Sequence, residues 1–163
     1  LRVPGAGGRN VITARQALDG AETGKNVAVI GGGLVGIETA EYLVERGHKV
    51  TIVEMQSDIG MDMGLISKMS MLEHYGKRDD FNYITGVKLT AIDAGNVTVE
   101  RDGKSDTLPG IDTVVLAVGS RPDGAMREEL DKAGVVYHTA GDVNKVGQIV
   151  HAVREAFELA MGI

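Results

Sequence analysis

One segment near the start of the chain joins a short apolar run, a cluster of glycines and a helical pattern of apolar residues. Residues 27–30 are a continuous apolar run of the length expected for a strand that is buried on both faces. Gly31, Gly33 and Gly36 follow it at the spacing G-x-G-x-x-G. Apolar residues then recur at helical spacing until Gly47: Ile37, Ala40, Leu43 and Val44. A second apolar run, 48–54, ends on Glu54, so the order predicts two buried parallel strands joined through a glycine turn and a helix.

The spacing of the glycines predicts a dinucleotide site at this turn. In a G-x-G-x-x-G turn, Gly31 permits the tight bend, Gly33 lets backbone approach a pyrophosphate, and Gly36 lets the helix pack closely on the strand. The unpaired N–H groups at the start of the following helix, at Leu34 and Val35, favour an anion. We therefore assign all five residues to cofactor binding.

Glu54 indicates which cofactor the site prefers. It lies 18 residues beyond the last glycine of the turn, where a carboxylate accepts hydrogen bonds from the adenosine ribose hydroxyls. A 2′-phosphate at that position would meet a like charge, and the next residues, Met55, Gln56 and Ser57, supply no cation. The sequence therefore favours NAD(H) over NADP, and we include Met55 in the predicted site.

The pattern beyond the second strand completes an α/β domain. A helix is predicted at 65–75, and strands are predicted at 86–93, 96–101 and 104–108, separated by turn residues that suit a small antiparallel meander. The apolar run within 112–118 then returns to the parallel sheet, because a continuous run of this kind is buried on both faces. We expect a Rossmann-like, doubly wound parallel sheet with a small antiparallel meander.

Three parts are predicted along the chain. They are a leader belonging to the flavin-domain side, a nucleotide-binding domain and the C-terminal part of an incomplete flavin domain: 1–24, 25–118 and 119–163. The leader contains a short helical stretch with Thr13 as its N-cap. In the last part we expect a polar helix at 125–132, a strand at 135–137 and an amphipathic helix at 147–161.

Composition excludes several classes of partner. The 17 Lys and Arg against 23 Asp and Glu give a net charge of −6, which argues against nucleic acid or an anionic membrane. The longest apolar run, 114–118, is far shorter than the roughly 20 residues that span a bilayer. The chain has no Cys, and its four histidines show no ligand spacing, so no metal site is predicted. A cytoplasmic setting is expected.

Three motifs spread over 31–160 resemble those of the two-dinucleotide-binding-domain flavoproteins, also called pyridine nucleotide-disulfide oxidoreductases. They are GGGLVGIETAEYL at 31–43, VVLAVGSRP at 114–122 and AGDVNKVGQIVHAVREAFELA at 140–160. Within this superfamily the chain is most similar to the C-terminal portion of NADH:flavin oxidoreductases of the 2,4-dienoyl-CoA reductase, 2-enoate reductase and trimethylamine dehydrogenase type. The lack of Cys argues against the thioredoxin reductase branch and leaves glutathione and lipoamide reductases open.

The resemblance implies FAD as a second cofactor and assigns residues to it. Asp142 matches an aspartate that hydrogen-bonds the flavin ribityl chain, and Gly141 matches a backbone position close to the flavin diphosphate. Gly147, Gln148 and Ile149 match the start of the last helix, whose amides face the isoalloxazine ring in the family. N–H donors there would stabilise negative charge on a reduced flavin.

The resemblance also assigns residues near the reactive end of the nicotinamide nucleotide. Glu38 matches a position close to the nicotinamide, and Val118 with Gly119 matches the segment that runs beside the dinucleotide. No side chain is assigned a catalytic role, because hydride transfer depends chiefly on how the two rings are stacked and oriented.

Two features of the resembled family have no counterpart in this sequence. They are the glycine-rich turn that opens the flavin domain, and the catalytic barrel with its iron–sulfur site. We therefore expect the partner of this chain to be an N-terminal part of the same polypeptide, and we expect the chain alone to lack activity. The predicted function is acceptance of NADH and transfer of hydride to FAD. The alternative is a non-catalytic module that holds ADP or NAD.

Overall fold

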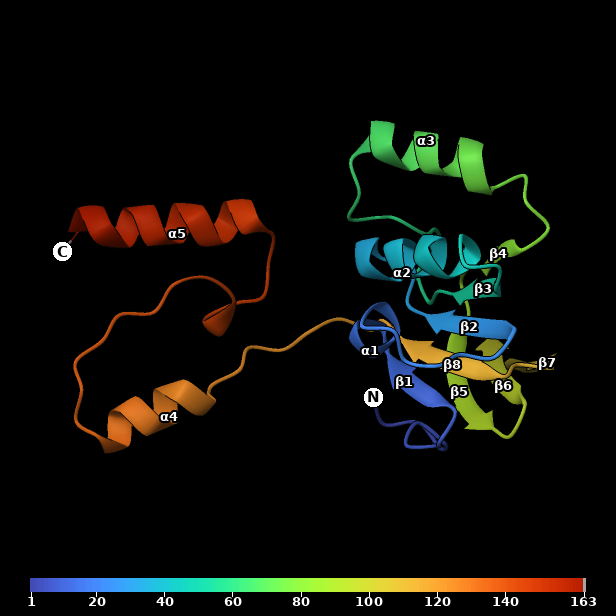
Figure 1. The fold of residues 1–163 in the computed structure, drawn as a ribbon, viewed down its shortest axis with the longest axis horizontal. Helices are drawn as coiled ribbons and strands as arrows, with labels where there is room; N and C mark the ends of the chain where they lie inside the picture. Colours follow the sequence, from blue (N-terminus) through green and yellow to red (C-terminus); the bar gives the residue numbers. More distant parts are fainter. Residues whose placement is uncertain (163) are drawn as a thin grey trace. The chain divides into compact units, whose positions relative to one another are not determined.

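The computed structural model describes residues 1–162, and the chain divides after Val118 into two compact units (Figure 1). The first unit is Leu1–Val118 and the second is Gly119–Ile163. Residues 1–24 pack within the first unit, because β1 (Val11–Thr13) pairs with a strand near the end of that unit. The three predicted parts of the intact protein stay a prediction.

A parallel sheet of five strands forms the centre of the first unit. Its order across the sheet is β1, β8 (Thr113–Leu116), β2 (Asn26–Ile30), β3 (Lys49–Val53) and β4 (Phe81–Ile84), and every neighbouring pair is parallel. The sequence patterns did not predict β4. This strand lies at the edge of the sheet, and its exposed Asn82 and Tyr83 interrupt the apolar run that marks a central strand.

Three helices cover one face of this sheet: α1 (Ala14–Leu18), α2 (Leu34–Val44) and α3 (Leu65–Tyr75). Val27 and Val29 of β2 point to this face and join a core cluster with residues of all three helices. The predicted apolar stripe of α2 is fully buried there: Ile37, Ala40, Leu43 and Val44. Thr13 caps α1 as predicted, since its hydroxyl accepts a hydrogen bond from the Gln16 N–H at 3.2 Å.

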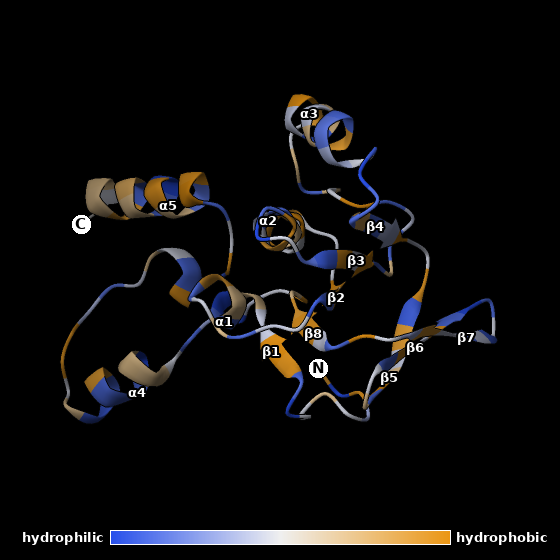
Figure 2. Ribbon diagram, turned by 45° about the vertical axis from the view of Figure 1, so that its right-hand side comes forward, coloured by the Kyte–Doolittle hydropathy of each residue, from blue (hydrophilic) through white to orange (hydrophobic). Residues whose placement is uncertain are grey.

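The predicted antiparallel meander covers the opposite face. Its strands are β5 (Lys88–Asp93), β6 (Asn96–Arg101) and β7 (Lys104–Pro109), paired in that order. Ala28 and Ile30 alternate with the valines of β2 and pack against this second layer, together with Val97 and Val99. Figure 2 shows apolar colouring on strands of the parallel sheet such as β1, and on helices α3 and α5. The predicted Rossmann-like fold with a small antiparallel meander is confirmed.

The order of the strands identifies the edge of the sheet at which a ligand is expected to bind. From β2 the chain crosses through α2 to β3 on one side, whereas β8 and β1 lie on the other side of β2. The strand order therefore changes direction between β2 and β8. In open α/β sheets a ligand binds at the carboxyl ends of the strands at such a point.

The second unit contains α4 (Ala125–Lys132), a short 3-10 turn η1 (Gly141–Val143) and α5 (Ile149–Gly162). The predicted strand at 135–137 is wrong: residues 119–162 form no strand that could pair with it, and Val136 is 92% exposed. The apolar side of α5 is exposed as well, at Val153, Phe157 and Met161. Across residues 1–162 no helix is both long and apolar enough to cross a membrane.

Substituting Gly36 by alanine tests the close packing of α2 on β2. A Cβ at this position would lie 1.9 Å from the Gly31 carbonyl oxygen, which is backbone and has little freedom to move. We expect Gly36→Ala to lower the free energy of unfolding by about 2–4 kcal/mol despite the better helix propensity of alanine. Urea unfolding measures this change.

Gly7→Ala is the matched control, because a Cβ there has no atom within 4 Å and the residue has no positive φ. It should stay within about 0.5 kcal/mol of the wild type. Equal stability of the two variants would contradict the close approach.

Candidate functional site

The glycine turn joins the end of β2 to the start of α2, and it lies against the end of β8. Gly31 has φ +106°, and a Cβ on it would come within 2.5 Å of the Ala117 carbonyl oxygen. Its N–H donates to the Val53 carbonyl at 2.9 Å, which ties the turn to β3. The backbone of three strands therefore meets at one place, and only glycine fits at the first position of the turn.

The first turn of α2 presents N–H groups that no side chain within the helix caps. Gly33 is the N-cap residue and supplies no side-chain hydrogen bond. The Leu34 N–H instead donates to the Asp62 carboxylate, at 2.9 Å to Oδ1 and 3.1 Å to Oδ2. Val35 is half exposed. An anionic group of the chain itself thus lies where the helix dipole and the free amides attract negative charge.

Glu54 is buried, and both of its carboxylate oxygens accept hydrogen bonds from backbone. Oε2 accepts from the Gly32 N–H at 2.5 Å and Oε1 accepts from the Gln56 N–H at 2.6 Å. Only 9% of the residue is exposed. The carboxylate therefore fixes the glycine turn relative to the end of β3, a role that its position in the sequence did not predict. Its predicted contact with a ribose stays a prediction.

Two hollows flank the turn. The smaller, of about 320 Å³, is lined by Gly32, Gly33, Glu54, Gln56, Asp58, Met61 and Asp62. The larger, of about 500 Å³, is lined by the ends of β2, β3 and β8, by the first three residues of the chain, and by residues at the start of β5. Gly33, Glu54 and Gln56 line both hollows. An elongated ligand that crosses the turn would therefore have space on each side of it.

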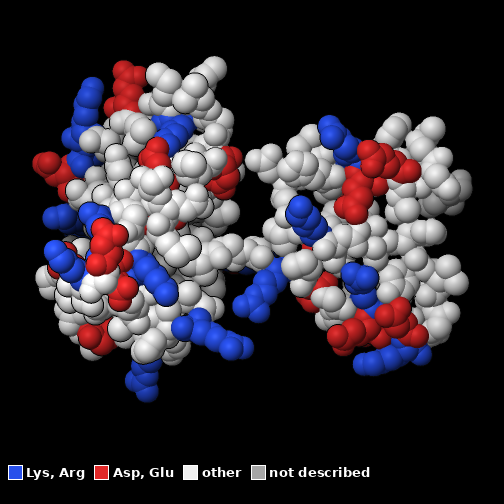
Figure 3. Space-filling view, turned by 180° about the vertical axis from the view of Figure 1, so that it is seen from behind, with Lys and Arg blue, Asp and Glu red and all other residues white. Residues whose placement is uncertain are grey.

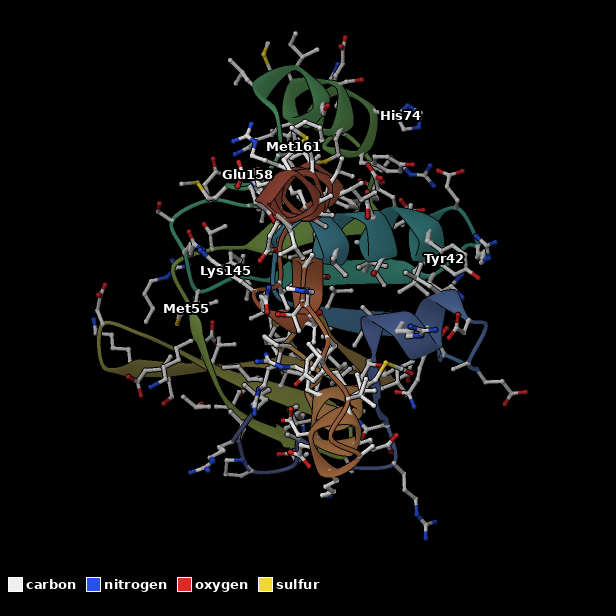
Figure 4. All side chains as sticks on the ribbon, turned by 90° about the vertical axis from the view of Figure 1, so that its left-hand side faces the viewer. Tyr42, Met55, His74, Lys145, Glu158 and Met161 are labelled. Carbon is white, nitrogen blue, oxygen red and sulfur yellow. The ribbon has the colours of Figure 1, made fainter. Side chains whose placement is uncertain are left out.

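Five of the nine predicted residues of the first unit gather at these hollows, whereas Leu34, Val35, Gly36 and Glu38 of α2 line neither. All five line the larger hollow: Gly31, Gly33, Glu54, Met55 and Val118. Met55, labelled in Figure 4, is 68% exposed and leaves the sheet at the end of β3. Val35 and Glu38 lie on an exposed part of α2. Sequence patterns missed Asp62, because nothing in the loop between β3 and α3 indicates that its carboxylate reaches α2.

Acidic groups outnumber basic ones at the smaller hollow. Glu54, Asp58 and Asp62 line it, and Lys68 of α3 pairs with Asp58 at 2.5 Å. The hydrogen bond from Lys68 lowers the pKa of Asp58 below its ordinary value. Elsewhere, acidic and basic side chains are interspersed over the face that Figure 3 presents. No cluster of His, Asp and Glu suited to a metal ion is found in residues 1–162.

Three predicted residues of the second unit, Gly141, Asp142 and Gly147, form hydrogen bonds within it, whereas Gly119, the first residue of that unit, is exposed and has φ +88°. The Gly147 N–H donates to the Asp142 carboxylate at 3.1 Å, and the Gly141 N–H donates to Glu155 at 2.7 Å. Asn144 also donates to Glu155, at 2.6 Å, and these bonds lower the pKa of Glu155 below 4.5. Gln148 lies just before α5, and Ile149, its first residue, is 83% exposed. The remainder of α5, including the labelled Glu158 and Met161, is shown in Figure 4.

A parallel sheet with a glycine turn at its switch point, a helix that starts on a glycine N-cap and a strand-end carboxylate defines a nucleotide-binding domain of the Rossmann type. The chain belongs to the pyridine nucleotide-disulphide oxidoreductase family, whose model matches residues 1–156. The predicted superfamily is thereby confirmed. Membership implies the use of FAD and of a pyridine nucleotide.

Individual proteins similar to this chain are also oxidoreductases by name. The chain is 43% identical to an NADH oxidase of Thermoanaerobacter brockii over 85% of its own length and 21% of the relative. It is 40% identical to a bilirubin reductase of Mediterraneibacter gnavus, over 80% of this chain and 20% of that protein. The solved structure of a 2-naphthoyl-CoA reductase matches the whole chain with a TM-score of 0.89 and 25% identity, over 25% of that protein. The chain thus spans between a fifth and a quarter of the length of these proteins.

Glu54→Gln tests whether the carboxylate holds the glycine turn. The side-chain amide of Gln has one acceptor oxygen in place of two, so either the Gly32 or the Gln56 N–H loses its partner. We expect the free energy of unfolding to fall by about 1–3 kcal/mol, measured by urea unfolding without nucleotide. The exposed Glu38→Gln is the control and should change by less than about 0.5 kcal/mol. Equal effects of the two substitutions would contradict the role of Glu54.

The lowered pKa of Glu155 predicts how pH affects the second unit. Because its folded-state pKa lies below 4.5, the stabilisation by Glu155 is complete above pH 4.5 and is lost as the pH falls through the lower folded-state value. Glu155→Gln should therefore reduce the hydrogen-exchange protection of the Gly141 amide at neutral pH. The difference from the wild type should shrink as the solution is made more acidic than pH 4.5. If the difference in protection between the variant and the wild type did not vary with pH, this prediction would be contradicted.

Proposed function

We propose that this chain is the part of a flavin-dependent oxidoreductase that binds NADH and presents it to FAD for hydride transfer. The observation that carries the proposal is the glycine turn at the sheet's switch point, held by Glu54 between two hollows. Family membership supports the nucleotide and the flavin as a pair. The printed name of one relative, an NADH oxidase, supports NADH as the reductant.

The charge at the smaller hollow supports NAD(H) over NADP. Its acidic side chains are Glu54, Asp58 and Asp62, and Lys68, the cation beside them, is already paired with Asp58. A 2′-phosphate would add a dianion to this surface without a free cation to balance it. NADPH should therefore bind more weakly than NADH.

The residues of this chain bind and orient rather than transfer protons. The amides of the glycine turn would hold the pyrophosphate, and the ends of β2 and β8 would border the nicotinamide. The flavin supplies the two-electron acceptor chemistry when it is bound. In the second unit, Asp142 and the residues at the start of α5 would face the flavin, and α5 would lower the energy of negative charge there through its N-terminal dipole.

The proposed partner is a flavin-binding portion of the same polypeptide, accompanied by a catalytic barrel. The exposed apolar side of α5 supports this proposal, because Val153 and Phe157 are 62% and 65% exposed. An exposed apolar helix face of this kind is typical of a surface that is buried against another part of the protein. The matched relatives are several times longer than this chain and would have room for both elements.

Calorimetric titration of the chain with NADH, NADPH and ADP tests the nucleotide site. We expect NADH to bind at least about tenfold more tightly than NADPH, because of the acidic hollow. ADP binding as tightly as NADH would indicate that the nicotinamide adds nothing, and would favour the non-catalytic module. Absence of binding by all three would overturn the nucleotide-binding proposal.

Gly33→Ala separates binding from folding in the same titration. Gly33 has extended backbone with φ −74°, and a Cβ there would lie 3.2 Å from the exposed Asp62 carboxylate, which can move. The fold should therefore persist while the methyl group obstructs the approach of a pyrophosphate. We expect NADH affinity to fall by about tenfold or more, with Gly7→Ala unchanged as the control. Unaltered NADH affinity in Gly33→Ala would show that the pyrophosphate does not approach the turn.

A further inference from the structure

The carboxylate of Asp62 lies against the Leu34 N–H, the first amide of α2. Both of its oxygens are within 3.1 Å of the Leu34 nitrogen, and Oδ2 would be the nearest atom to a Cβ on Gly33. It therefore covers the amide that the glycine turn exposes toward the hollow. This is also the position at which a helix N-terminus attracts the phosphates of a nucleotide.

The loop that carries Asp62 is fastened to the same turn. The Gly60 N–H donates to the Gly32 carbonyl at 2.7 Å, and Ile59 is completely buried in the core beneath α2. Asp58, the residue before Ile59, pairs with Lys68 of α3. Met63 is held as well, because its N–H donates to the Gly60 carbonyl at 3.2 Å and its side chain packs against the core. Between Gly60 and Met63, Met61 and Asp62 are both exposed. The exposed side chain of Asp62 can therefore turn away from Leu34 while the backbone of the loop stays in place.

We propose that Asp62 is a built-in competitor for the pyrophosphate: it caps α2 when no nucleotide is bound and is displaced when one binds. This inference rests on the proposed function. The two anions would compete for one amide and would repel each other if both stayed there. Part of the binding free energy of the nucleotide is then used to release Asp62, so the observed affinity is lower than the turn alone would give.

The test compares ADP and adenosine binding to the wild type, Asp62→Ala and Asp62→Asn by calorimetry. Without the competing carboxylate, we expect Asp62→Ala to bind ADP about three- to tenfold more tightly. Asp62→Asn should show a smaller gain, because its neutral amide oxygen still accepts from Leu34. Adenosine has no phosphate, so its affinity should change little in either variant.

Asp79→Ala is the charge-matched control. Asp79 is an exposed acid of the same unit, and within residues 1–162 its side chain lines neither hollow and forms no ion pair. Removing it lowers the negative charge of the protein equally and should leave ADP affinity unchanged. A gain in Asp79→Ala as large as that in Asp62→Ala would mean that overall charge is responsible, and would overturn the inference.

A second measurement needs no nucleotide. The loss of a helix cap in Asp62→Ala should lower the thermal midpoint by about 2–4 °C and speed hydrogen exchange at the Leu34 amide. If the wild type binds ADP while Asp62→Ala shows equal or weaker affinity, the competitor role is wrong and the proposed function stands. If neither protein binds ADP, the proposed function itself fails. Binding by Asp62→Ala alone would support both.

Discussion

The first turn of α2 lies almost in contact with the end of β2, and no side chain fits between them. Gly36 and the Gly31 carbonyl approach so closely that a single methyl group would overlap the oxygen. This approach sets the direction in which α2 leaves the sheet, and hence which of its side chains enter the core. It also leaves no side chain of the turn over the Leu34 N–H, which donates instead to the exposed Asp62 carboxylate. Packing and ligand access thus both depend on the absence of a side chain at Gly31 and at Gly36.

Glu54 completes that arrangement from the neighbouring strand. A buried carboxylate is costly unless its oxygens are hydrogen-bonded. Here one oxygen accepts from the Gly32 N–H within the turn, and the other accepts from the Gln56 N–H just beyond β3. The acid therefore fixes the relative positions of the glycine turn and the end of β3. A residue chosen by its place in a cofactor fingerprint thereby also belongs to the scaffold of the site. Its substitution cannot be interpreted as a change of cofactor preference alone.

The two faces of the parallel sheet explain why the site lies at its edge. Alternate residues of β2 enter two separate cores, one beneath the helices and one beneath the antiparallel meander. Both faces are covered, so the strand ends are where a ligand can reach the backbone. The loop after β3 lies at this edge as well, which brings Asp62 within reach of α2 although 28 residues separate it from Leu34.

The sequence alone determined the elements whose patterns are local. The helical stripe of α2, the helix at 65–75, the hairpin strand Asn96–Arg101 and the Thr13 cap were all predicted from spacing and capping chemistry. The family was evident from three motifs for the same reason. Each consists of residues that are close together in the chain.

Tertiary structure decided what depends on distant segments meeting. It made β4 a strand by giving it β3 as a partner, and left 135–137 without one, although the second segment is the more apolar. It joined β1 to β8 across about a hundred residues, and it turned Glu54 and Asp62 toward the same glycine turn. Hydrogen bonds between remote groups have no periodicity in the sequence. Only the folded chain shows which carboxylate accepts from which amide.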